Sequence, residues 1–209
     1  MNYSKVNIVI VVLLIFHLVG VWGLSSSYQA LFLELTPFNL LLSLALFIWA
    51  NNDFSFESFK MTVVLFFIGF FVEVVGVNTA LLFGEYSYGK TLGTKLMDTP
   101  LIIGVNWILL AFSSFSASSY FLKNKTLIIL LSSVIMVMMD VLIEPIAISL
   151  DFWTWAGGEI PLQNYVMWFL VSLIMNALIS FARLTFDYRL SFGLLLSQIL
   201  FFTLLPLSL

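Results

Sequence analysis

Seven long apolar stretches are the feature that most constrains how this chain can fold. A helix needs about 20 apolar residues to cross roughly 30 Å of hydrocarbon. With 62% hydrophobic residues, 9% charged residues and a mean hydropathy of +1.12, the chain is far too apolar for a water-soluble domain. The predicted spans are 6–24, 28–50, 59–83, 100–122, 126–150, 163–182 and 189–208.

The polar segments between these spans, such as 51–53, 123–125 and 187–189, are too short to form a separate soluble domain. The first apolar run follows Lys5 and lacks a small-x-small cleavage pattern, so it is predicted to span the membrane rather than to be a signal peptide. We therefore expect an all-α integral membrane protein in which residues 1–209 form a single polytopic domain, one bundle of about seven transmembrane helices.

The distribution of lysine and arginine predicts the orientation of the bundle, because cytoplasmic loops are enriched in these residues. A cytoplasmic N-terminus leaves two of the eight basic residues, Lys90 and Lys95, outside. It would place these six inside: Lys5, Lys60, Lys123, Lys125, Arg183 and Arg189. The prediction is a multi-pass protein of the cell (inner) membrane, with its C-terminus outside.

Composition excludes several kinds of site. The net charge of −3 and the absence of a basic tract argue against nucleic acid as a partner. The chain has no cysteine, so it has no disulfide, iron–sulfur cluster or thiolate metal site. The single histidine, His17, cannot build a histidine-rich metal site and is expected to be structural. Without a glycine-rich phosphate loop either, we expect no metal and no cofactor.

Polar residues inside the predicted spans are the main candidates for function, because burying them in a membrane is costly. At a rise of 1.5 Å per residue, Glu73 and Asp140 would lie about 15 Å from the outer side, and Glu34, Asn106 and Glu144 about 9 Å. Four predicted helices therefore bring polar groups into one layer. Glu34 is close enough to the interface that contact with water explains its presence in a span nearly as well as a shared polar site does.

The spacing of these residues supports a shared site. Asp140 and Glu144 are four residues apart and lie on one helix face. Glu73 shares its face with Gly69 and Gly76, whose small size allows close helix approach. With no lysine or arginine at this depth, the carboxyl groups favour their neutral, protonated form. Proton donation is the natural use of such groups.

The predicted outer loops add aromatic and amide side chains beside this layer. They are Tyr86, Tyr88, Trp153, Trp155, Asn164, Tyr165 and Trp168. Tryptophan and tyrosine at this level are equally typical of the interfacial aromatic belt. For Asn78, Asn106 and Asn176, the alternative interpretation is hydrogen bonding between helices.

Two blocks of sequence resemble the membrane carotenoid hydratases of the CruF type. The first runs from Glu73 through Tyr86 to Trp107, and the second from Asp140 to Trp168. They follow one another in the order that the family shows. The chain departs from the family pattern at residue 80, an alanine where the resemblance leads us to expect glycine.

The resemblance implies hydration of the terminal 1,2 double bond of an acyclic carotenoid, giving a tertiary 1-hydroxyl group. The partners would be a hydrophobic carotenoid, water and the lipid bilayer. A buried carboxylic acid can protonate such an alkene while a second carboxylate orients water and aromatic faces stabilise the cation. We predict Asp140 or Glu144 as the acid and Glu73 as the group that positions water. The predicted substrate-binding residues are Tyr86, Asn106, Trp107, Trp153, Trp155, Asn164 and Trp168.

Three other functions remain open at this stage. A lycopene-cyclase-like enzyme would begin with the same protonation but capture the cation with a neighbouring double bond. A prenyltransferase could use Asp140 and Glu144 to bind a divalent ion, although no second aspartate-rich motif and no basic cluster are present. A non-enzymatic transporter or lipid-binding protein would use the carboxylates as a proton relay, although no internal repeat is evident.

Overall fold

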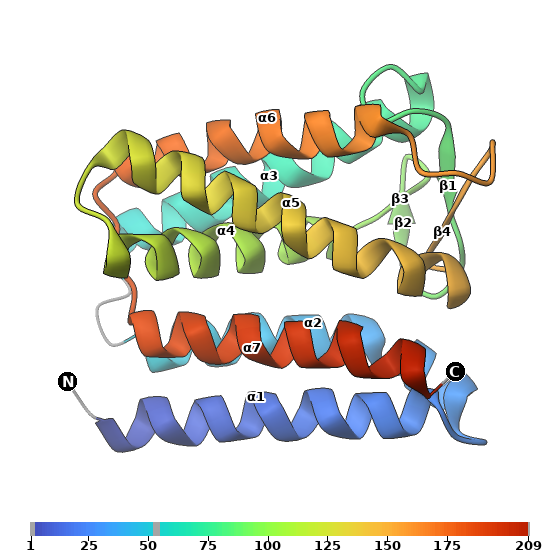
Figure 1. Cartoon of the computed structure of the whole chain (residues 1–209), viewed down its shortest axis with the longest axis horizontal. Coiled ribbons are helices and arrows are strands. Elements are labelled where there is room, and N and C mark those ends of the chain that lie inside the picture. The colour runs from blue at the N-terminus through green and yellow to red at the C-terminus, as the bar shows by residue number, and fades with distance from the viewer. Residues whose placement is uncertain (1–2, 52–54, 209) are drawn as a thin grey trace.

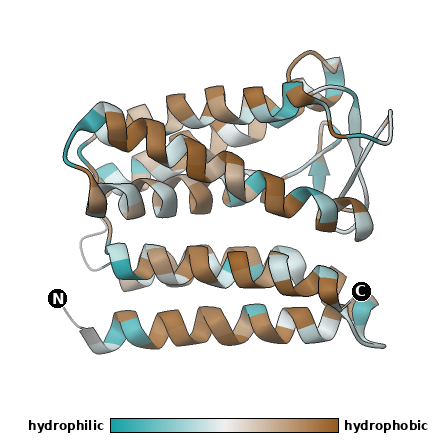
Figure 2. Ribbon diagram, in the orientation of Figure 1, coloured by the Kyte–Doolittle hydropathy of each residue, from teal (hydrophilic) through white to brown (hydrophobic). Residues whose placement is uncertain are grey.

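The computed structural model describes residues 3–51 and 55–208. Within them, seven helices are long and apolar enough to cross a membrane, which confirms the predicted number of spans. Successive helices run in opposite directions, and hydrophobic residues cover most of their length (Figures 1 and 2). They are α1 (Tyr3–Leu24), α2 (Gln29–Ala50), α3 (Phe56–Thr79), α4 (Ile102–Phe121), α5 (Lys125–Ser149), α6 (Leu162–Phe181) and α7 (Tyr188–Leu204), followed by the short 3-10 helix η1 (Leu205–Leu207).

Helix α4 lies at the centre of the bundle and contacts α2, α3, α5, α6 and α7. Every residue from Ile102 to Ser118 is buried except Asn106. Small residues allow the neighbouring helices to approach closely. A Cβ atom added at Gly69 of α3 would lie 2.6 Å from the Cβ of Trp107, so the predicted close approach at Gly69 is confirmed.

Helix α3 ends four residues before the predicted boundary, at Thr79. The next residue, Ala80, has a φ of 57°, in the left-handed region that favours glycine. This conformation gives a physical reason for the glycine that the family resemblance leads one to expect. The early end of α3 frees residues 80–85 to cross over the end of the bundle.

Two short antiparallel ribbons, which the sequence interpretation did not predict, lie at the same end of the bundle (Figure 1). Strand β1 (Tyr86–Tyr88) pairs with β4 (Trp153–Trp155), and β2 (Lys95–Leu96) pairs with β3 (Thr99–Pro100). We call this end of the molecule the ribbon end. The alternation of aromatic and small polar residues in Tyr-Ser-Tyr and Trp-Thr-Trp was the sequence signal for β1 and β4.

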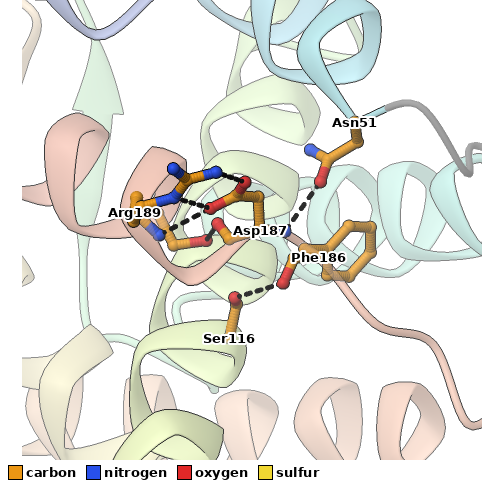
Figure 3. Close-up of polar contacts among 6 residues, drawn as sticks. Asn51, Ser116, Phe186, Asp187 and Arg189 are labelled. Atoms are coloured by element: carbon orange, nitrogen blue, oxygen red, sulfur yellow. Dashed lines mark hydrogen bonds and ion pairs between the residues drawn. The ribbon is translucent and has the colours of Figure 1, made fainter. Parts of the chain in front are cut away.

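At the opposite end, Asp187 joins α7 to its neighbours (Figure 3). Its carboxylate accepts hydrogen bonds from the backbone N–H of Arg189 and from the Arg189 guanidinium, with a closest distance of 2.7 Å. The Asp187 N–H donates to Asn51 at the end of α2 (2.8 Å), and Ser116 of α4 donates to the Phe186 carbonyl (3.1 Å). These contacts fix the start of α7 against α2 and α4.

The charge on Asp187 should stabilise the fold above about pH 4. Burial alone would raise the pKa of Asp187, but the hydrogen bonds and charge of Arg189 outweigh it and hold the pKa below its usual value. A lowered pKa in the folded state means that the stabilisation is present above the unfolded pKa of about 3.9 and is lost as pH falls through the folded pKa.

We therefore expect Asp187→Asn to lower the melting temperature of the detergent-solubilised protein at pH 7, and this difference to shrink towards pH 3. Asparagine can still cap the helix, so the change isolates the charge. Glu57→Gln is the control, because the ion pair of Glu57 with Lys60 is largely exposed and contributes little. A melting-temperature difference that is independent of pH would contradict this assignment.

Candidate active site

The ribbon of β1 and β4 points its aromatic side chains into the bundle. Successive residues of a strand face opposite sides, and here Ser87 and Thr154 are exposed while their aromatic neighbours are buried. The backbone pairs Glu85 with Ala156 (3.0 Å) and Gly89 with Phe152 (2.9 Å) on either side. The antiparallel alternation then makes the two intervening aromatic pairs non-hydrogen-bonded pairs, whose side chains approach most closely. These pairs are Tyr86 with Trp155 and Tyr88 with Trp153.

Glu73 of α3 accepts hydrogen bonds from three buried side chains. Tyr86 and Tyr88 both donate to its Oε2 atom, at 2.6 and 2.8 Å, and the indole of Trp107 donates to Oε1 at 3.0 Å. Gly76 permits this arrangement, because an added Cβ there would lie 2.9 Å from the Tyr86 hydroxyl oxygen. Both oxygens of Glu73 are therefore occupied by donors.

The two tyrosines are held as hydrogen-bond donors. Burial raises the pKa of Tyr86 far above its ordinary value, and the neighbouring Glu73 raises it further. The same two causes, in the same order, raise the pKa of Tyr88. Both phenols consequently keep their protons at any physiological pH.

Glu144 of α5 also receives three donors, whereas Asp140 one turn earlier receives one. Trp153 and Trp155 donate to the Oε2 atom of Glu144 at 3.0 and 2.9 Å. The Asn164 amide donates to Glu144 Oε1 at 3.2 Å and to Asp140 Oδ2 at 2.7 Å. Asp140 is fully buried, and its Oδ1 atom has no hydrogen-bond partner. The helical spacing predicted for these two carboxylates thus places them on either side of one amide.

A small cavity lies among these side chains. It has about 20 Å³ of space for the centre of a water molecule, which is room for one water. All ten of the predicted catalytic and substrate-binding residues line it, although their roles stay predictions. The cavity is also lined by Phe83, Tyr88, Ile103 and Ile143, which were not among the predicted site residues. Among the described residues, no group of three or more histidine, cysteine, aspartate or glutamate side chains could hold a metal ion.

A larger, mainly apolar pocket adjoins this cavity. Its volume is about 350 Å³, and it lies between α1, α2 and α7 on one side and α4 and α5 on the other. The two spaces share four lining residues: Ile103, Asn106, Ile143 and Trp153. A long apolar molecule in the pocket could therefore reach the carboxylates with one end.

The asparagines and Glu34 fall into different environments. Asn176 of α6 bonds to Ser133 and Met136 of α5, both at 3.4 Å, as expected for a contact between helices. Asn78 bonds to the Met97 carbonyl in a loop. Asn106 has no hydrogen-bond partner among the described residues and lies where the two cavities meet. A hydrogen bond between helices therefore does not explain the asparagine at this position.

Glu34 does not join the carboxylate cluster. Its side chain is exposed on α2 and lines neither cavity, so of the two interpretations of Glu34 the structure favours solvation over a place in the shared site. Depth along a helix does not specify which side of the helix faces the bundle.

Removing one donor from Glu144 should destabilise the fold. Trp155→Phe keeps an aromatic ring but removes the indole N–H, and losing a partner of a buried polar group costs about 1–3 kcal/mol. We expect a melting temperature several degrees lower. Thr154→Val, on the exposed face of the same strand, should change it little. Equal melting temperatures for the two variants would show that the ribbon does not stabilise Glu144.

Comparison with known proteins places this geometry in context. Residues 36–207 match the family model described as "Carotenoid biosynthesis protein". A bisanhydrobacterioruberin hydratase of Haloarcula japonica is 31% identical over 118 residues. That alignment covers 53% of this chain and 40% of the relative, so the match spans less than half of the relative's length. No solved structure matches the chain.

Proposed function

Because this chain belongs to the carotenoid biosynthesis protein family, we propose that it is a membrane enzyme that hydrates an acyclic carotenoid. The reaction adds water across the terminal 1,2 double bond and gives a tertiary 1-hydroxyl group. The unpaired Oδ1 atom of Asp140, in a one-water cavity between two fully bonded carboxylates, is the observation that carries this proposal. The name of the Haloarcula relative, a hydratase, supports the same type of reaction.

Asp140 is the proposed acid. A buried polar oxygen without a partner costs about 1–3 kcal/mol, and among the described residues Asp140 Oδ1 is the one such oxygen that lines the small cavity. A proton on Oδ1 is free to move to a substrate in the cavity, because no protein group holds that atom. Glu73 and Glu144 are less suited to this step, since donors already occupy both oxygens of each.

Glu73 and Glu144 are proposed to act on the cation and on water. Three N–H or O–H donors to each of these groups offset part of the cost of ionising it in a buried site, and a negative charge there would favour a nearby carbocation. The aromatic walls add attraction for the cation, and the rings of Trp107 and Trp168 stack 3.9 Å apart beside it. Glu73 or Glu144 then orients the water that attacks.

The reaction balances without a cofactor. Asp140 transfers its proton to C2, and the alkene electron pair forms the new C–H bond and leaves a tertiary cation at C1. Water adds to C1, and the proton released from that water returns to the carboxylate cluster and restores protonated Asp140. The sum is one alkene and one water giving one alcohol.

The apolar pocket is the proposed site for the chain of the substrate. Two lining residues from α1, Phe16 and Val19, and two from α2, Leu35 and Phe38, are also exposed on the outer surface of the bundle. In a bilayer this surface faces lipid, so a carotenoid can enter sideways between α1 and α2. Asn106 lies at the junction where the end group would pass toward Asp140.

Asp140→Asn tests the acid. In cells that accumulate lycopene, wild-type protein should give a product heavier by one water, measured by chromatography and mass spectrometry. The variant keeps the shape of the side chain but lacks the acid, so we expect hydration to fall at least about a hundredfold. Glu34→Gln, a carboxylate removed outside both cavities, is the matched control and should retain activity.

The possible outcomes separate the candidate reactions. Hydration that survives in Asp140→Asn would contradict the proposed acid. A product of unchanged mass with the retention of a ring-bearing carotene would show cyclisation instead. If well-expressed wild-type protein left both lycopene and an acyclic-ended monocyclic carotene unchanged, the hydratase proposal would fail and transport would become the leading alternative.

We also propose that residues 1–209 form a single domain in the cell membrane with the ribbon end outside. The chain has no cysteine, so single introduced cysteines report position cleanly. We expect Ser87→Cys in β1 to react with a membrane-impermeant maleimide in intact cells, and Lys123→Cys, between α4 and α5, to react after permeabilisation. The reverse pattern would contradict the predicted orientation.

A further inference from the structure

The apolar pocket contains a buried amide that the proposed reaction does not use. Gln198 of α7 lines the pocket and is 3% exposed, and its Oε1 atom has no hydrogen-bond partner. An unpaired amide oxygen in such a place is unfavourable, and an apolar side chain of the same length would avoid that cost. The pocket therefore offers a hydrogen-bond acceptor to a bound molecule at this position.

His17 of α1 supplies a second polar group to the same wall. Its Nδ1 atom lies 2.7 Å from the Leu13 carbonyl, an oxygen that can only accept, so Nδ1 carries the proton. In the neutral ring Nε2 is then an acceptor, and it has no partner among the described residues. A structural role for His17, as predicted, thus accounts for Nδ1, whereas Nε2 stays available to accept a hydrogen bond.

The two side chains belong to helix faces that pack together. His17 meets the ring of Phe201 edge-on, with centroids 6.0 Å apart. Phe201 lies three residues after Gln198, on the same face of α7. Gly20 lies three residues after His17, and an added Cβ there would be 3.1 Å from Phe201. The imidazole and the amide therefore lie on the wall that α1 and α7 build together.

The chemistry of this wall indicates a hydroxyl group. The amide offers an acceptor oxygen and an NH2 group that donates, and the imidazole offers an acceptor, which together suit a group that both donates and accepts. None of the described residues that line the pocket is charged, so neither an anion nor a cation is favoured. Thr36 uses its hydroxyl on the Phe32 carbonyl, while Asn39 adds a further amide from α2.

We propose that Gln198 and His17 bind a hydroxyl group on the isoprenoid that fills the apolar pocket. The enzyme would then favour a substrate that already carries an alcohol, at a position removed from the double bond that reaches Asp140. This inference rests on the proposed function for its substrate class. It also implies that an alcohol-forming reaction precedes this one.

Binding of a short acyclic isoprenoid alcohol tests the inference without catalysis. Farnesol and farnesene share a carbon skeleton and differ in the hydroxyl group. Quenching of tryptophan fluorescence in the full-length, detergent-solubilised protein reports binding, because Trp153 lines the pocket. We expect farnesol to bind at least about tenfold more tightly than farnesene, the effect of one good hydrogen-bonded hydroxyl. Equal affinities would overturn the inference.

Two variants locate the hydroxyl site. Gln198→Met should reduce the ratio of the two affinities to about one, and His17→Phe should reduce it while keeping a ring against Phe201. Gln29→Met, a glutamine that lines neither cavity, should leave the ratio unchanged. If both Gln198→Met and His17→Phe retained the wild-type preference for farnesol, the hydroxyl would bind elsewhere and the inference would be wrong.

Stability without ligand gives a second, independent readout. Because Gln198→Met removes an unpaired buried amide, we expect its melting temperature to match or exceed that of the wild type. A structural glutamine would behave oppositely, so a large loss of stability or failure to fold would contradict the inference. The folded His17→Phe variant then still measures the preference for the alcohol.

The outcome is separable from that of the proposed function. Hydration of lycopene with no preference for farnesol would overturn this inference alone. A preference for farnesol that depends on Gln198, in a protein that hydrates no carotenoid, would retain the hydroxyl site and remove the hydratase proposal.

Discussion

A carboxylate inside a bilayer has no water to solvate it, and one whole end of this molecule is organised around that constraint. Glu73 and Glu144 each receive three hydrogen bonds from side chains. Helix backbones cannot supply such donors, because their N–H groups are already bonded within the helix. The donors come largely from the β1–β4 ribbon, whose alternation sends every second side chain inward.

The ribbon in turn depends on how closely the helices pack below it. Gly69 lets α3 lie against Trp107 of α4, and Gly76 leaves room for the hydroxyl of Tyr86. With α4 buried from Ile102 to Ser118 apart from Asn106, the base of the site is rigid. At the other end of the bundle, Asp187 and Asn51 fix α7 and α2 around the same helix. These contacts hold α2, α4 and α7 together at the end opposite the carboxylates.

Six buried side-chain oxygens of the described residues have no hydrogen-bond partner, and two of them, on Asp140 and Gln198, line the cavities. Asp140 Oδ1 lies in the polar cavity, beside carboxylates whose own oxygens are fully bonded. Gln198 Oε1 lies in the apolar pocket that leads to it. Each is unfavourable in the empty protein, and in the two proposals a bound molecule supplies the missing partner.

The sequence by itself determined the number of spans, which spans carry the carboxylates, and the shared face of Asp140 and Glu144. These properties follow from local rules, namely the length of hydrocarbon to be crossed and the rise and period of a helix. The resemblance of residues 73–168 to a family added a reaction and a set of pocket residues, and the family match supports a role in carotenoid biosynthesis.

Only the tertiary structure decided which polar groups meet. Pairing of β1 with β4 joins residues 67 positions apart in the chain, a contact that no local pattern specifies. The rotation of each helix about its axis turned Glu34 outward and brought Gln198 into the pocket. Glu144 also differs from Asp140 in its donors, because Trp153 and Trp155 of β4 donate to Glu144 alone. Local sequence sets where a side chain lies along its own helix, whereas its hydrogen-bond partners depend on how separate elements pack.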